Sequence, residues 1–333
     1  MKKEIFTLVL MLSFVACVIA QPGTVGTGNH SMNHSKHEKN GNTSLGLTYD
    51  TTACGLNYTQ ATSLITTRYN ASSVNHNYGY GFPDTLTLAR LPGNYSIAKA
   101  YLYINESYIT ACTTPIISFT DPSGNPHNIG ASLIGTSGPV CWGETGTRTF
   151  RADVTNYITS NGNYMIDSIS CSSVWEVDGA TLLVIYQDLS ANYEGTFVIF
   201  DGCDAIDGGV ITAIVNPFSV CQTPIYGRGF VIAADFNDNV GPHTTIVNNQ
   251  NYTFQSKFMN FDDTIANFIT GQTSAIMGDS TMADCYLVSA AGIYYRDTCT
   301  FCNMYFTVTM NEIPIACNNN YGEGYIESLS GGI

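Results

Sequence analysis

The chain has 333 residues, with 12 Lys and Arg against 26 Asp and Glu, and a formal net charge of −14. This balance argues against nucleic-acid binding, because phosphate contacts need clustered Lys and Arg. Charged residues make up only 11% of the chain, well below the usual ~25%. We therefore expect a surface made polar by Asn, Ser, Thr and glycans, or a surface that is covered by a partner.

Residues 1–20 have the pattern of a secretory signal peptide. A positive start precedes an apolar run that is too short to span a bilayer, and Val18 and Ala20 are small residues at the expected cleavage positions. We predict cleavage before Gln21, export from the cell and no membrane span. Lipid modification of Cys17 is the alternative interpretation.

The remaining chain divides into three predicted parts. Residues 21–44 are rich in Gly, Asn, Ser, Thr and His, with almost nothing to bury, which predicts a disordered or glycosylated tail. Adventitious metal binding is the alternative for its histidines. Residues 45–83 are expected to form an N-terminal β extension. Residues 84–333 are expected to form a β-sandwich module with a C-terminal tail.

Short strands separated by turns are expected from residue 45 onward. Alternating apolar and polar residues predict strands at DTLTLARL (84–91), AKAYLYI (98–104), PIISFT (115–120) and MYFTVTM (304–310). Turn residues occur at DPSGNP (121–126), SNGN (160–163) and DGG (207–209). The pattern predicts an all-β fold, a large β-sandwich or jelly-roll-like module with an N-terminal extension.

Two continuous apolar runs predict strands that are buried on both faces. They are ATLLVIY (180–186) and GTFVIF (195–200). The first has no charge, Pro or Gly and would promote aggregation on an open edge, so we predict a central, fully covered strand. Short helices are expected only at DVTNYIT (153–159) and DDTIANFIT (262–270).

Cysteine usage predicts disulfides. Loss of Cys17 with the signal peptide would leave ten cysteines, and an even set in an exported chain favours disulfides over metal binding. The candidates are Cys54, Cys112, Cys141, Cys171, Cys203, Cys221, Cys285, Cys299, Cys302 and Cys317. Cys203 and Cys221 enclose a hairpin-sized segment and are the expected internal pair.

The C-x-x-C sequence at Cys299 and Cys302 also occurs in zinc and redox sites. Here it lies between two strand-like segments of an exported chain, which favours disulfides. On a regular strand the two side chains point to opposite faces, so we expect two different partners, one of which is proposed to be Cys285. Cys54 and Cys317 lie near the chain ends, where they could reach a neighbouring subunit.

The N-glycosylation pattern occurs eight times. The candidate sites are Asn29, Asn33, Asn42, Asn57, Asn70, Asn94, Asn105 and Asn251. Seven of the eight precede residue 108, and attached glycans are bulky. We therefore predict that residues 21–107 include a solvent-facing surface, and that contacts between subunits fall mainly within residues 108–250.

Asp-rich segments raise the question of calcium. DFNDNVG offers oxygen ligands at Asp235, Asn237 and Asn239, but Ile246 stands at the twelfth position, where a calcium loop has Glu. DGCDAIDGG (201–209) is a second such segment. Turn formation through side-chain hydrogen bonds is the alternative for both. No other cofactor is expected.

No catalytic motif is recognisable. His76, His127 and His243 do not lie in nucleophile-like contexts, and G-x-S-x-G, H-E-x-x-H and phosphate-loop patterns do not occur in the sequence. We do not expect an enzyme.

The order of several motifs resembles a secreted all-β module of archaeal and bacterial surface proteins. These motifs are AYLYI, ISFTDPSG, ADVTNYI, DGATLLVIYQD, GTFVIFDG, GFVIAADFND and DCYLVS. They span about residues 84–312 and look most like an archaeal family of exported β-proteins that includes the cell-sheath proteins of filamentous methanogens. The resemblance implies an extracellular structural role and no catalytic residues. The many cysteines depart from the common module and favour a covalently hardened assembly.

The function predicted first is a secreted structural protein that assembles with copies of itself into an extracellular cell sheath or surface layer. A surface adhesin or ligand-binding β-module is the alternative. A secreted hydrolase is the third hypothesis.

Overall fold

The computed structural model describes residues 43–65, 81–108, 111–138, 145–172, 177–216, 218–220, 224–236, 242–297, 306–312 and 324–331. Predictions for the signal peptide and the tail up to residue 42 lie outside these residues. The same holds for Cys141, Cys221, Cys299, Cys302, Cys317, Asn29, Asn33, Asn42, Asn70, Asn237 and Asn239.

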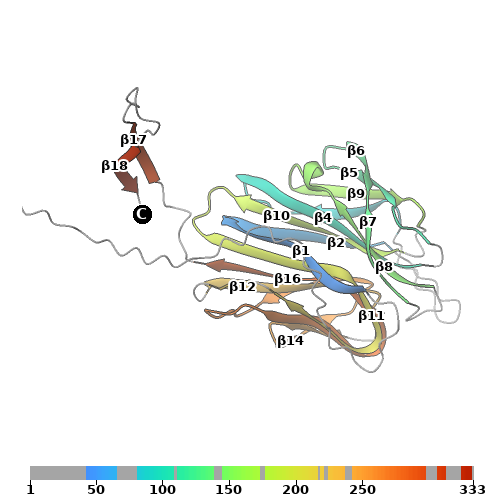
Figure 1. The fold of residues 1–333 in the computed structure, drawn as a ribbon. Helices are drawn as coiled ribbons and strands as arrows, with labels where there is room; N and C mark the ends of the chain where they lie inside the picture. Colours follow the sequence, from blue (N-terminus) through green and yellow to red (C-terminus); the bar gives the residue numbers. More distant parts are fainter. Residues whose placement is uncertain are drawn as a thin grey trace, which may run out of the picture. The chain divides into compact units, whose positions relative to one another are not determined.

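The described chain is nearly all β, as predicted, and its strands form antiparallel sheets (Figure 1). The seven-stranded sheet has the order β1 (Thr43–Cys54), β11 (Glu194–Val215), β16 (Ala275–Asp297), β12 (Tyr226–Ala234) and β15 (Met259–Ile265), and β13 (Pro242–Val247) and β14 (Gln250–Gln255) join it at β16. The five-stranded sheet has the order β2 (Leu56–Leu64), β10 (Val177–Asp188), β4 (Tyr95–Tyr108), β8 (Gly146–Asp153) and β7 (Ser132–Ser137).

Two smaller sheets complete the described strands. The four-stranded sheet has the order β3 (Asp84–Leu88), β9 (Gly162–Ile169), β5 (Ile116–Thr120) and β6 (Pro126–Gly130). The hairpin of β17 (Phe306–Glu312) and β18 (Gly324–Gly331) forms a sheet of its own. β1 and β2, from the expected N-terminal extension, are edge strands of the two largest sheets.

The five-stranded sheet is the middle layer of a three-layer sandwich. Leu182 and Val184 of β10 belong to the hydrophobic cluster shared with the four-stranded sheet. Leu183 and Ile185 belong to the cluster shared with the seven-stranded sheet. Successive side chains of a strand point to opposite faces, so a strand covered on both sides must be apolar at every position.

The prediction of a central, covered strand at residues 180–186 is confirmed. β10 is hydrogen-bonded to β2 on one side and to β4 on the other. Every residue of the run is buried. The run at 195–200 is also buried on both faces, within β11.

The helix predicted at residues 262–270 is wrong. β15 continues to Ile265 and pairs with β12, and the segment after it is irregular. Adjacent Asp262 and Asp263 lie on opposite faces of this strand, each with a partner from elsewhere in the fold. The other expected helix is a single 3-10 turn, Thr155–Tyr157.

The DGG segment at 207–209 lies inside β11. Irregularities in the β11–β16 register occur beside it, and Gly208 and Gly209 have positive φ values of 65° and 112°. Glycine adopts this conformation without the steric cost that a side chain would add. The segment therefore distorts a long strand locally and does not end it.

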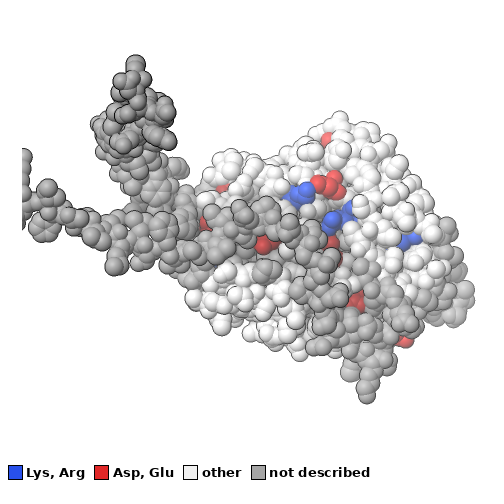
Figure 2. All heavy atoms as spheres, viewed as in Figure 1, with Lys and Arg blue, Asp and Glu red and all other residues white. Residues whose placement is uncertain are grey.

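Charged side chains are sparse on the face shown in Figure 2, and basic and acidic groups adjoin near its centre. One ion pair lies within the five-stranded sheet, and another joins this sheet to the seven-stranded sheet. Lys99 Nζ lies 2.5 Å from Asp153 Oδ2, and Arg151 Nη1 lies 2.5 Å from Asp201 Oδ2. Among the described residues, no helix is long and apolar enough to cross a membrane.

Candidate functional site: a buried histidine and two aspartates

His243 is the first inward-facing residue of β13. It shares this face with Thr245 and Val247, and all three side chains are buried. Phe236 stacks on the imidazole with ring centroids 4.2 Å apart. A buried imidazole needs hydrogen-bond partners, and these come from two other strands.

Two carboxylates face the Nε2 atom of His243. Asp262 Oδ2, from β15, lies 2.6 Å away, and Asp279 Oδ2, from β16, lies 3.4 Å away. The three possible ligand atoms all lie within 4.8 Å of one another. The registers of β13 with β16 and of β15 with β12 bring these residues together.

Neighbouring polar groups orient the three side chains. Ser256 Oγ lies 3.2 Å from Nδ1 of His243, on the side of the ring away from the aspartates. The backbone N–H of Ser280 donates to Oδ1 of Asp279 at 2.7 Å, which leaves Oδ2 directed at the cluster. The Thr245 hydroxyl donates to Asp262 Oδ2 at 3.0 Å.

Burial dominates the electrostatics of this cluster. Desolvation, followed by the negative charge of Asp262, raises the pKa of Asp279 well above its usual range. Two carboxylates this close in a dry site cannot both remain ionised without a nearby positive charge. The cluster can therefore take up a proton or hold a cation.

A polar groove reaches the edge of the cluster. Its volume is about 490 Å³, and Asp262, Phe254, Lys257 and Asn260 form one wall. The other wall comes from β2 and from Asp84 at the start of β3. Asp262 thus borders both the buried cluster and an open cavity.

Asp235, the first residue of the predicted calcium segment, is held by hydrogen bonds to other parts of the fold. Asp235 is buried and has a φ of 72°, its N–H donates to Phe258 O at 2.9 Å, and Ser107 Oγ donates to its carboxylate at 3.3 Å. The other two proposed ligands lie outside the described residues, so calcium there remains a prediction.

The second Asp-rich segment does not form a turn. Asp201, within β11, accepts hydrogen bonds from Tyr103 at 2.8 Å and from Arg151 at 2.5 Å. The ion pair and the phenol hydrogen bond fix β11 to the five-stranded sheet.

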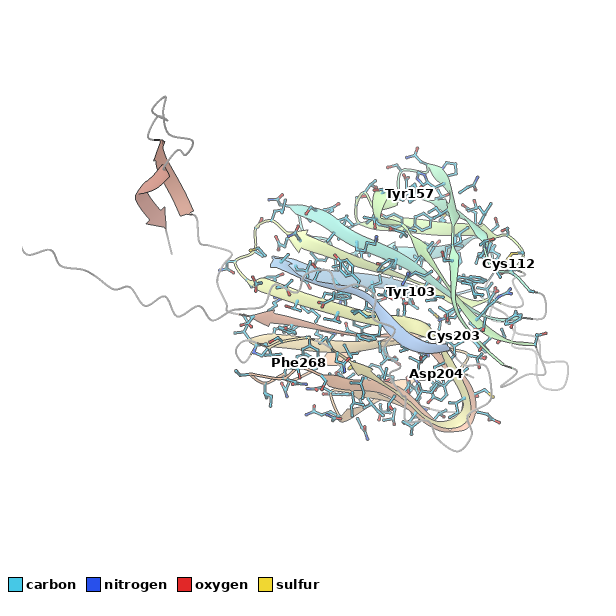
Figure 3. All side chains as sticks on the ribbon, viewed as in Figure 1. Tyr103, Cys112, Tyr157, Cys203, Asp204 and Phe268 are labelled. Atoms are coloured by element: carbon cyan, nitrogen blue, oxygen red, sulfur yellow. A yellow bond between two sulfur atoms is a disulfide. The ribbon has the colours of Figure 1, made fainter. Side chains whose placement is uncertain are left out.

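The cysteines give one correction. Cys112 and Cys171 form a disulfide with their Cα atoms 6.1 Å apart, and Cys54 and Cys285 each belong to a further disulfide. Cys203 is a free, buried thiol, so the expected pair with Cys221 is wrong. Its side chain points between the two largest sheets, 3.9 Å from the Thr147 hydroxyl; Figure 3 shows it well away from Cys112.

Burial also corrects one predicted glycosylation site. Asn105 has no exposed surface, and its amide donates to Ser289 Oγ of the seven-stranded sheet at 3.1 Å. A glycan cannot be attached there in the folded protein. Asn94 and Asn251 are exposed and Asn57 is partly buried, so these three remain candidates.

Sequence reasoning missed the histidine cluster. Asp262 and Asp279 lie 19 and 36 residues after His243, and no short motif links them. The usable signal was the alternation in HTTIV, which places His243 on the same strand face as Val247. The other two histidines that the sequence analysis names are not in this cluster. Nε2 of His127, on β6, lies 3.2 Å from Asp121 Oδ2, and His76 lies outside the described residues.

Comparison with protein-family models gave no match, and a search of curated proteins found no similar sequence.

Proposed function

We propose that the chain is a secreted structural protein that assembles with copies of itself into an extracellular cell sheath or surface layer. The observation that carries the proposal is an exposed apolar row on the seven-stranded sheet, on the strand face opposite the buried Ile211, Ala213 and Val215. It consists of Val210 and Ile214 of β11 and Ile276 of β16, which are 38%, 46% and 37% exposed. Ile214 and Ile276 are direct cross-strand partners.

The apolar row lies on a part of β11 that has a single strand partner among the described residues. Within the described strands, β11 pairs with β16 alone from Ile206 to Val215, because its pairing with β1 ends at Cys203. Unpaired backbone groups next to apolar side chains are a template for pairing with another chain. We assign this surface, the β11 surface, to a second copy of the protein.

Two further features support a structural role. The three-layer core buries apolar side chains on both faces of the middle sheet, and the fraction of surface that folding buries rises with domain size. Disulfides add resistance to unfolding, at roughly 2–4 kcal/mol each. We assign no reaction to the chain.

The polar groove favours one alternative, a ligand-binding or adhesive surface module. Its carboxylate, amide and hydroxyl groups suit a hydroxyl-rich ligand. This alternative predicts a monomer that binds a saccharide through the groove, and it leaves the β11 surface without a role.

The test is the oligomeric state of the secreted protein, measured by light scattering and electron microscopy. We expect polymers or sheets from the native chain. Ile214→Glu places a charge in the β11 surface and should release smaller species. The matched control, Ile116→Glu, changes a residue that is 52% exposed on β5 and should assemble normally.

A monomeric native chain at all concentrations would refute self-assembly. Equal assembly of the two variants would refute the assignment of the β11 surface and leave self-assembly standing. Boiling detergent with and without reductant then shows whether disulfides harden the assembly.

A further inference from the structure

We propose that His243, Asp262 and Asp279 bind a divalent transition-metal ion, which holds the β13–β14 hairpin against β15 and β16. The proposal is independent of self-assembly, since it concerns the interior of one subunit. The three donors come from three different strands, so one ion would link three strands at a single point.

The donor set suits a transition metal. An imidazole nitrogen and two carboxylate oxygens are ligands for ions such as Zn²⁺, and sites with three protein ligands complete their coordination with water. Calcium takes six to eight oxygen ligands and no nitrogen. The donor atoms lie within 4.8 Å of one another. Binding one ion at ~2 Å requires separations of about 4 Å or less, which a small movement of the side chains achieves.

The surrounding contacts present the correct atoms. A metal-binding histidine typically uses its other ring nitrogen for a hydrogen bond that fixes the ring. Ser256 fills this role at Nδ1, and Nε2 faces the carboxylates. Asp279 is held in the same manner, with Oδ1 on the Ser280 N–H and Oδ2 turned inward.

The charge of the three side chains and the access to them from the groove also favour a metal ion. The two aspartates and the histidine are at most 4% exposed, and a divalent cation would neutralise both carboxylates. The groove beside Asp262 offers a path for the ion and for a water ligand. The competing interpretation is a closed hydrogen-bond cluster in which a proton replaces the metal.

The experiment uses the full secreted chain, stripped with EDTA and titrated with ZnCl₂ by calorimetry, with metal content measured after dialysis. We expect about one Zn²⁺ per chain in the buried site and a thermal midpoint that rises with zinc. Cobalt(II) should give a visible absorption band from the same site. Asp279→Asn should abolish the site, with folding checked by circular dichroism.

Ser256→Ala keeps all three donors and should bind zinc roughly 10–100-fold more weakly, because it loses only the hydrogen bond that orients the ring. His127→Gln is the matched control, since it removes a histidine–aspartate contact in a different sheet. It should bind zinc as the native chain does.

The histidines of the N-terminal tail are a second possible source of zinc binding. Substitution of His30, His34 and His37 by Gln separates the two, and the buried site should survive it. The proposal is overturned if the native chain shows no zinc-dependent midpoint. It is also overturned if Asp279→Asn binds zinc as tightly as the native chain.

Discussion

Replacing Val184 with Asp tests the role of β10 as the covered centre of the middle sheet. Val184 has no exposed surface, and it lies opposite Ala100 on β4 and Thr59 on β2. Aspartate fits the space of valine closely, so the main effect is electrostatic. The buried carboxyl must either stay charged in an apolar layer or take up a proton.

The free-energy cost of the substitution is the sum of three contributions. To be neutral at pH 7, the carboxyl must be protonated about 3 units above its ordinary pKa, which costs roughly 4 kcal/mol. Loss of the buried valine side chain adds about 2 kcal/mol. One hydrogen bond from the Thr59 hydroxyl recovers about 1 kcal/mol. The net loss of about 5 kcal/mol equals the whole stability of a marginal domain.

Urea unfolding followed by circular dichroism measures this loss. Ile116→Asp, at an exposed strand position, is the control and should change the unfolding free energy by about 0.5 kcal/mol or less. Because the folded-state pKa at position 184 lies above the unfolded value, folding takes up a proton, and the deficit should be smallest below about pH 4. Equal midpoints for the two variants at pH 7 would contradict the covered position of β10.

Three further predictions concern single side chains. Burial raises the pKa of the Cys203 thiol to about 12, so it should react with a maleimide only after unfolding; labelling of the native protein would refute its burial. Mass spectrometry of the secreted chain should find Asn105 without glycan, and occupancy there would contradict the packing of β4 on the seven-stranded sheet. The pKa of Asp121 is lowered to about 2, and hydrogen bonds from Asn125 are the largest cause of this shift. Its contribution to stability should therefore be present above the unfolded pKa of about 3.9 and be lost as pH falls through 2. An NMR titration of Asp121 with an ordinary midpoint would exclude this.

The fold class and the covered strands could be predicted from the sequence because they depend on local patterns. A strand buried on both faces must be apolar at each position, and residues 180–186 meet that condition. The segment at 262–270 could not be assigned in this way. Its two aspartates satisfy partners on other strands, and a lone sequence window gives no information about those partners.

The candidate site was hidden for the same reason. His243 finds Asp262 and Asp279 through strand register, which is set by pairing over the whole sheet. Asn105 and Cys203 fit short patterns that favour a glycan and a disulfide. Both side chains point between the two largest sheets, and only the packing of those sheets reveals that they are inaccessible.

The free thiol of Cys203 changes the parity of the cysteines. On the cleavage predicted before Gln21, an exported chain carries ten of the eleven cysteines. With Cys203 set aside, nine remain, and an odd number cannot all be paired within one chain. Each such chain therefore has at least one further sulfur atom that stays reduced or bonds to another molecule. Two copies can join these unpaired sulfur atoms in an intermolecular disulfide, so every subunit would have one cysteine available for a covalent link to a neighbour.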